Sequence, residues 1–181
     1  MSTSTCQITS GFALGCRDNS GGIKAIYILS GSVSGITDTS DEISVISGSG
    51  IFYQFDLQRG TSDFTETING STENQTVFYE ATVNAAFAKL QTSLRNQVKI
   101  LAQNPDLKIV VETNNSVSGE KFIYVGRENG ALLNAGQGQS GTALGDANGY
   151  TLTFGSQEPN PADMIAGTSL SAALSGITVS Q

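Results

Sequence analysis

The stretch QRGTSDFTETINGSTENQTVFYEATVNAAFAKLQTSLRNQVKILAQNPDLKIVV, residues 58–111, decides the fold. It contains two runs typical of strands around an Asn-Gly pair, followed by a segment with a helical period. Asn84 is the expected N-cap and Asn104-Pro105 the expected end, so we predict a helix over residues 85–103. Its apolar residues recur every three or four positions, as on a helix packed against a sheet: Val83, Phe87, Leu90, Leu94, Val98 and Leu101.

The segment before the predicted helix is expected to form a long hairpin. Apolar and polar residues alternate in Ser62–Ile68 and again in Gln75–Val83. Between these runs stands Asn69-Gly70, and Asn-Gly favours the type I′ turn because both of its central residues need a positive φ. The two arms are longer and more polar than a buried hairpin requires. We expect them to protrude or to pair with the edge of another chain.

Further strand candidates precede and follow this stretch. Gly-, Ser- and Thr-rich segments at 30–40 and 136–149 are interpreted as loops. Nearly continuous apolar runs predict strands covered on both faces, whereas strict alternation predicts half-buried strands. The candidates are 22–29, 43–46, 51–57, 107–111, 121–125, 131–133 and 150–154.

Together these elements predict a mainly β protein. The strands number about eight, and their connections are too short for a wound parallel sheet, so we expect an antiparallel β-sandwich or half-barrel with one flanking helix. A chain of 181 residues is long enough for one domain with a real core. We expect an N-terminal arm over 1–21, the β domain over 22–162 and a C-terminal tail of small residues over 163–181.

Charge is scarce and unevenly distributed. Only 14% of the residues are charged and the net charge is −7, yet Lys89, Arg95 and Lys99 give the predicted helix +3 and leave −10 for the remainder. Specific binding of DNA or RNA needs clustered Lys and Arg and is not expected. The three cations predict a strip that meets an acidic surface on a neighbouring copy, with a solvated face as the alternative. Ile100, opposite the apolar stripe, fits either a second contact surface or a singly exposed apolar residue.

The sequence offers little to catalysis. It has no histidine, which removes Ser-His and Cys-His nucleophiles and the usual imidazole metal ligands. Cys6 and Cys16 are too few for a disulfide-stapled fold. The run GQGQSG at 136–141 matches a dinucleotide-binding pattern, but no helix is predicted after it, and Asp146–Gly149 lacks the closing Glu of a calcium loop. We predict no catalytic, cofactor-binding or metal-binding residue, and therefore no enzyme.

Membrane association is not expected either. No apolar segment approaches the roughly 18 residues of a membrane span. The polar start Met1–Thr5 lacks the basic and apolar parts of a signal peptide, so we expect production inside the cell.

The order of these features resembles the tail-tube proteins of tailed bacteriophages, which are similar in fold to the tube proteins of contractile secretion systems. The resemblance rests on TETING at 65–70 with VFYEATV at 77–83, and on GYTLTFGSQEP at 149–159. It covers about Gly22 to Ala162. It implies a virion structural protein, assembled in the bacterial cytoplasm, whose copies form hexameric rings that stack into the hollow tail tube.

The same resemblance implies the partners and the subunit interface. DNA would pass through an acidic lumen without specific binding, and sheath and baseplate proteins would be further partners. The wall would be a closed barrel in which every edge strand is paired. The helix would contact the neighbouring subunit, and the hairpin, arm and tail would bridge adjacent rings. The candidate interface residues are Phe64, Ile68, Asn69, Gly70, Val77, Tyr79, Lys89, Arg95, Lys99 and Ile100.

Two other classes of function remain open at this point. A capsid decoration protein or fibre domain with a β-sandwich fold would form small closed oligomers. A small-ligand-binding module or hydrolase would use the carboxylates with Tyr53, Tyr79, Tyr124 or Tyr150, and it would bind its ligand as a monomer.

Overall fold

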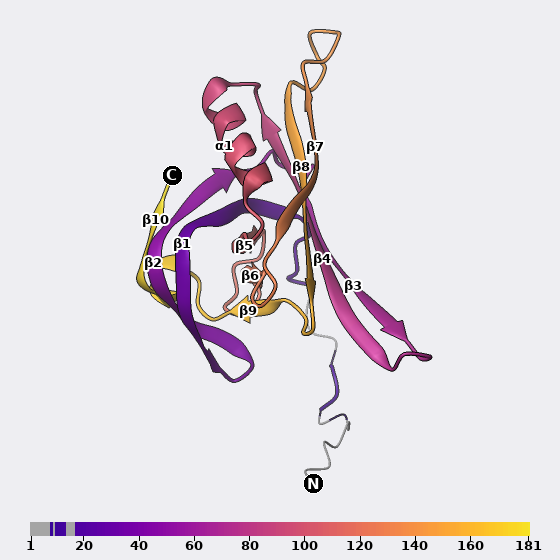
Figure 1. The fold of residues 1–181 in the computed structure, drawn as a ribbon, viewed down its shortest axis with the longest axis vertical. Coiled ribbons are helices and arrows are strands. Elements are labelled where there is room, and N and C mark those ends of the chain that lie inside the picture. Colours follow the sequence, from indigo (N-terminus) through magenta and orange to yellow (C-terminus); the bar gives the residue numbers. More distant parts are fainter. Residues whose placement is uncertain (1–7, 9, 14–16) are drawn as a thin grey trace.

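A computed structural model describes residues 8, 10–13 and 17–181 and confirms a mainly β protein with one α-helix (Figure 1). The two cysteines considered above for a disulfide, Cys6 and Cys16, lie outside the described residues. Within the described part of the predicted arm, 8, 10–13 and 17–21 form no helix or strand and are exposed. The elements are β1 (Ile23–Thr39), β2 (Glu42–Asp56), β3 (Asp63–Ser71), β4 (Thr76–Ala88), α1 (Thr92–Gln103), β5 (Ile109–Thr113), β6 (Phe122–Val125), β7 (Leu132–Gln139), β8 (Gly149–Glu158), β9 (Asp163–Ile165), the 3-10 helix η1 (Leu170–Ala173) and β10 (Leu174–Ser180).

Six strands form one sheet in the order β1-β5-β6-β9-β2-β10. Because β1 also pairs with β2 along most of its length, β1, β5, β6, β9 and β2 make a closed circuit of pairings. Figure 1 shows β1 and β2 curving together around one side of the molecule. Gly31 and Gly50 face each other in this pair with positive φ, and a Cβ on either would collide with the opposite backbone. The glycines therefore permit the close approach of the two curving strands.

The other four long strands form an antiparallel sheet in the order β3-β4-β8-β7. Phe64 lies opposite Val83, and Val83 lies opposite Phe154, so one face of this sheet carries apolar residues from three neighbouring strands. That face packs against the six-stranded sheet. Figure 1 shows the β3–β4 and β7–β8 hairpins projecting from opposite ends of the molecule.

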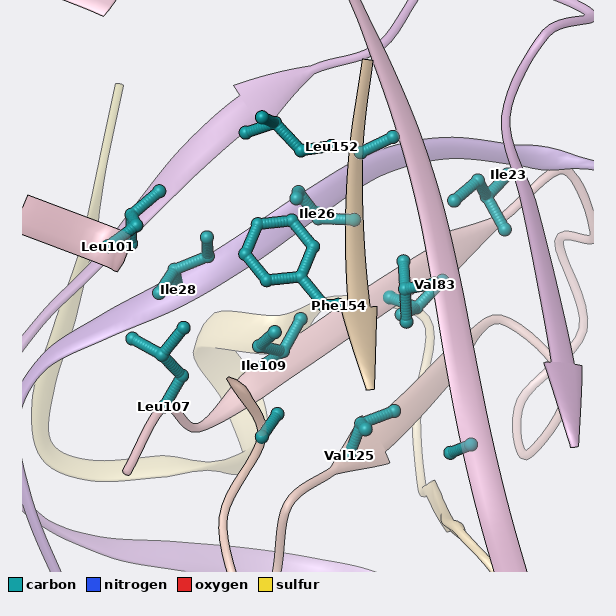
Figure 2. Packing of buried hydrophobic residues seen from close by; sticks show 14 of the residues in the cluster. Ile23, Ile26, Ile28, Val83, Leu101, Leu107, Ile109, Val125, Leu152 and Phe154 are labelled. Carbon is teal, nitrogen blue, oxygen red and sulfur yellow. The ribbon is translucent and has the colours of Figure 1, made fainter. Parts of the chain in front are cut away.

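Two hydrophobic cores result from this arrangement. The first core lies between the sheets, where Phe154 is surrounded by Ile26, Ile109 and Leu152 (Figure 2). Leu101 of α1 closes this core at one side. The second lies inside the curled six-stranded sheet. Strands β1, β5 and β6 separate the two cores, which explains their nearly continuous apolar sequences and confirms the prediction of strands covered on both faces.

The predicted start of the helix is wrong. Residues 85–88 belong to β4, where Phe87 pairs with Tyr150, and the helix begins at Thr92 after the N-cap Gln91, not Asn84. The error arises because Val83 and Phe87 fit two patterns. Their spacing of four residues matches the helical period, but they also belong to a series buried at every second position, which is the strand period: Ala81, Val83, Ala85 and Phe87. The predicted end is confirmed, since the helix stops at Gln103 with Asn104 as its C-cap.

The predicted hairpin is confirmed but its turn is misplaced. Asn69 and Gly70 continue β3 opposite Phe78 and Val77, and neither residue has a positive φ. The chain turns instead through residues 72–75, where Gln75 has φ +52°. A turn at Asn69-Gly70 would have broken the alignment of Phe64 with Val83. Burial of that pair therefore overrides the local turn preference.

Three segments interpreted as loops or tail contain strands. β1 continues through residues 30–39 and turns at Ser40-Asp41, both with positive φ. β7 extends to Gln139, and only residues 140–148 form the loop. Residues 163–181 contain β9, η1 and β10, and β10 pairs parallel to β2. Ile177 and Leu170 anchor this segment in the second core, so a few well-placed apolar residues suffice among many small ones.

Candidate assembly interface

One face of the four-stranded sheet is covered by no other element among the described residues. In antiparallel pairs, residues directly opposite each other point to the same side, so the register defines this face. We call it the polar face, and none of its members is buried. It comprises Asp63, Thr65, Thr67 and Asn69 of β3, Phe78, Glu80, Thr82, Asn84 and Ala86 of β4, Thr151, Thr153, Gly155 and Gln157 of β8, and Leu132, Ala135, Gln137 and Gln139 of β7.

Side-chain hydrogen bonds run across the polar face. The Asn84 amide donates to the Asp63 carboxylate at 3.2 Å, and the Thr153 hydroxyl donates to the Asn84 carbonyl oxygen at 2.9 Å. Near the hairpin tip, Asn69 donates to Glu80 at 3.3 Å. These bonds connect β3, β4 and β8 and hold the short side chains against the sheet. The face is therefore mostly hydrophilic, and Phe78 and Leu132 are the two large apolar residues exposed on it.

The four strands of this sheet contain no lysine or arginine. Their charged residues are all acids, and two of these, Asp63 and Glu80, lie on the polar face. The charge of the polar face is thus negative, and it lies on β3 and β4. The face offers no cation to a phosphate.

Both edges of this sheet are unpaired within the described chain. β3 forms one edge and β7 the other. The sheet is antiparallel and has an even number of strands, so β3 and β7 run in opposite directions. The β7 edge of one copy could therefore pair with the β3 edge of a second copy and continue the antiparallel pattern.

The two projecting hairpins carry exposed apolar side chains. On β3 and β4, Ile68 is 66% exposed and Val77 is 53% exposed, because their arms extend beyond the six-stranded sheet. In the β7–β8 loop Leu144 is fully exposed. The Asp146 carboxylate accepts the backbone N–H groups of Ala143 and Thr142 at 2.7 and 2.8 Å, which lowers the pKa of this carboxyl and gives the loop a defined shape.

The predicted interface residues fall into three groups. Ile68, Gly70, Val77, Arg95, Lys99 and Ile100 are exposed. Asn69 is half-buried on the polar face, while Phe64 and Tyr79 are half-buried on the opposite face, and Phe64 packs against the first core. Lys89 is exposed but precedes the helix, at a position with φ +72°, so its predicted place on the helix flank is wrong. Lys89, Arg95 and Lys99 form no ion pair with any other described residue.

Several charges of the six-stranded sheet, by contrast, are paired. Buried Glu112 accepts a hydrogen bond from the Tyr27 hydroxyl at 2.7 Å and lies 3.3 and 3.5 Å from the ammonium groups of Lys24 and Lys121. Burial, followed by this hydrogen bond, raises the pKa of Tyr27. Across the same sheet, Arg127 binds Asp38 through two hydrogen bonds and Asp163 through one. These contacts fasten the ends of the curled strands.

The tyrosines considered for ligand binding are not gathered at one site. Tyr79 and Tyr124 line a cavity of about 20 Å³ together with Glu66 and Glu158, which has room for about one water molecule. Neither Tyr53 nor Tyr150 lines this cavity. The Tyr124 hydroxyl is buried without a hydrogen-bond partner among the described residues, and burial raises its pKa. Glu158 accepts the N–H groups of Glu128 and Asn129 at 3.0–3.2 Å and so fixes the β6–β7 turn.

No metal site is evident in the described part of the chain, where no three His, Cys, Asp or Glu residues are grouped to hold an ion. No described helix is long and apolar enough to cross a membrane. Comparison of the chain with family models, with curated proteins and with solved structures gave no match.

The polar face was missed by the sequence analysis, although signals for it are present. Thr65 and Thr67, Thr82 and Asn84, and Thr151 and Thr153 each occupy alternate positions of a strand. The absence of Lys and Arg from all four segments was also readable. What the sequence did not provide was the register, which places these residues side by side.

Proposed function

We propose that this chain is a non-enzymatic virion structural protein that forms the tail tube of a bacteriophage. Its copies assemble into hexameric rings, the rings stack, and the genome passes through the bore. The observation that carries this proposal is the four-stranded sheet, which combines an open, cation-free polar face with two unpaired edges of opposite direction.

Lateral pairing of edges explains why so extensive an open sheet is tolerated. An unpaired edge invites uncontrolled association unless it is blocked, covered or closed into a barrel. Joining β7 of each copy to β3 of the next removes both edges when the ring closes. Barrels of about 16–18 strands already enclose an aqueous channel, and six copies of a four-stranded sheet exceed that number.

The polar face is suited to line such a channel. Short hydroxyl and amide side chains make most of its surface hydrophilic, and Asp63 and Glu80 repel the phosphates of DNA. Without Lys or Arg there is no counterion release to hold the duplex in place. DNA can then slide through the bore without sticking to its wall.

The edge pairing is tested by cysteine cross-linking of the full chain. Cys6 and Cys16 are first replaced by serine, and Thr67→Cys on β3 is then combined with Gln137→Cys on β7; both positions lie on the polar face. Because the intermolecular register is not fixed in advance, Thr65→Cys with Gln137→Cys forms a second pair. Oxidation is expected to give a ladder of covalent oligomers up to the hexamer in one of the two pairs.

The matched control carries Thr82→Cys on the central strand β4 in place of the β3 cysteine. In this control one cysteine stays on the β7 edge, but the other lies on β4, which is not an edge strand, so no ladder should form. A ladder in the control, or none in either edge pair while rings are visible, contradicts the edge pairing. Uniform small oligomers would favour the decoration or fibre class.

A further inference from the structure

The two ends of the four-stranded sheet differ in charge. At one end, the backbone N–H of Lys89 donates to the carbonyl of Asn148 at 2.7 Å, which places Lys89 beside the β7–β8 loop. Arg95 lies in the first turn of α1, which starts at the same end (Figure 1). Both cations are exposed and lack an ion pair in the described chain. Even with the Asp146 carboxylate of the β7–β8 loop counted, these two cations give this end a net positive charge.

The opposite end is anionic. The β3–β4 hairpin, residues 63–88, contains no Lys or Arg and carries Asp63, Glu66, Glu73 and Glu80. Glu73 is exposed at the turn, and Glu80 lies one hydrogen bond from Asn69 near the tip. The ten residues of β8 put roughly 30 Å between the two ends, so these opposite charges do not neutralise each other within one molecule.

Both ends also carry apolar side chains without a partner. At the anionic end, Ile68 and Val77 lie on the same side of the hairpin, because Ile68 is opposite Tyr79 and Val77 is two positions along from Tyr79. At the cationic end, Leu144 projects fully exposed from a loop whose shape the Asp146 carboxylate holds. A loop that is already ordered loses less conformational entropy on binding.

We propose that the β7–β8 loop of one copy docks onto the β3–β4 hairpin of a second copy in the next ring. Leu144 packs against Ile68 and Val77, while Lys89 and Arg95 face the acidic hairpin. The two surfaces differ, so each copy offers one and receives the other, and the contact repeats without closing. This inference rests on the proposed tube and names the surfaces through which its rings stack.

The test uses two charge-introducing variants of the full chain, Leu144→Asp and Val77→Asp, examined by electron microscopy and sedimentation velocity. Each places a carboxylate in the apolar contact between Leu144 and the hairpin, where it has no hydrogen-bond partner. We expect rings to form as in the unaltered protein but tubes to shorten about tenfold or to disappear. Val117→Asp is the matched control, because Val117 is comparably exposed, at 49%, in the β5–β6 connection; it should leave tube length unchanged.

Cross-linking provides the second measurement. With Cys6 and Cys16 replaced by serine, Leu144→Cys in one preparation should form a disulfide with Val77→Cys in another when the two are mixed. Neither preparation alone should cross-link. Tubes of unaltered length in both Asp variants, together with no mixed disulfide, overturn the docking.

Failure of the docking and failure of the tube proposal give different results. If tubes form but do not depend on Leu144 or Val77, the docking is wrong and the tube stands. If the protein forms linear strings without rings, and Leu144→Asp dissolves them, the docking stands and the ring proposal is wrong. A monomer at every concentration contradicts both.

Discussion

The two sheets of this protein treat their edges and charges in opposite ways. In the six-stranded sheet five strands pair in a closed circuit and only β10 is left at an edge, the strands between the two cores are buried on both faces, and Glu112 and Arg127 are held by partners. In the four-stranded sheet one face is open, both edges are unpaired within the described chain, and no cation balances its acids. The first sheet is built to stabilise one molecule. In the proposed tube, the second sheet would use its two unpaired edges to bind other copies.

The largest expected effect on stability comes from a comparison of two adjacent residues of β8 that point to opposite faces of the sheet. Phe154 is fully buried in the first core, and Phe154→Ala should lower the free energy of unfolding by about 3–5 kcal/mol. Thr153 points to the polar face, where Thr153→Ala removes one hydrogen bond to Asn84 and should cost about 1 kcal/mol or less. Urea unfolding of the dissociated protein measures both. Similar losses for the two variants would contradict the assignment of the faces.

The second-largest loss of stability is expected on removal of Glu112, the buried carboxylate of the six-stranded sheet. Glu112→Ala leaves the buried Tyr27 hydroxyl without its acceptor and removes the carboxylate beside the Lys24 and Lys121 ammonium groups, of which Lys121 keeps its hydrogen bond to the Thr168 carbonyl. We expect the free energy of unfolding to fall by about 2–3 kcal/mol. The value is at the low end for a buried pair because the Lys24 side chain is largely exposed and solvent screens it. Glu120→Ala, at an exposed position near by, should change the free energy of unfolding by no more than about 0.5 kcal/mol.

Alkaline pH should weaken the same sheet. Burial raises the pKa of Tyr27 and of Tyr124 above that of an unfolded chain, so the folded state keeps these protons more tightly. Their contribution is fully present below about pH 10, the ordinary tyrosine pKa, and is lost as pH rises above it. Thermal unfolding from pH 8 to 11 should therefore show a falling midpoint. Tyr27→Phe should flatten that fall.

The smallest effect on stability is expected on the polar face, where the effect on function should be clear. Thr151 is exposed there, and Thr151→Lys should change the free energy of unfolding by no more than about 0.5 kcal/mol. In the proposed hexameric ring this substitution adds six cations, which would give the bore an affinity for phosphates, so assembled tubes should retain DNA at low salt and release it at high salt. Thr178→Lys on β10 is the control on the other sheet. Equal DNA retention by both variants would remove the polar face from the bore.

Sequence reasoning predicted the fold class and most of the strands because apolar runs such as those of β1, β5 and β6 reflect burial on both faces. It misplaced the start of α1 because Val83 and Phe87 fit both the strand and the helical period. It also placed the hairpin turn at Asn69-Gly70, whereas the chain turns at residues 72–75, because the pairing of Phe64 with Val83 sets the turn and the local residues do not.

The candidate interface was predicted only in part for the same reason. Ile68 and Val77 were recognised as members of a protruding hairpin, which their exposure agrees with. The polar face and Leu144 were not recognised, because the first depends on the register of four strands and the second on which part of residues 136–149 becomes the loop. Both depend on pairing between strands that are distant in the sequence, which local sequence patterns do not predict.

Electron microscopy of the purified full chain, at low and high protein concentration, tests the central claim most directly. The claim is that the four-stranded sheet is the surface through which copies assemble, with its polar face turned to a bore. The account predicts sixfold rings at low concentration and hollow tubes at high concentration, with a continuous barrel lining the tube once images are averaged. Uniform small particles at every concentration, or tubes whose bore is lined by the six-stranded sheet, would contradict it.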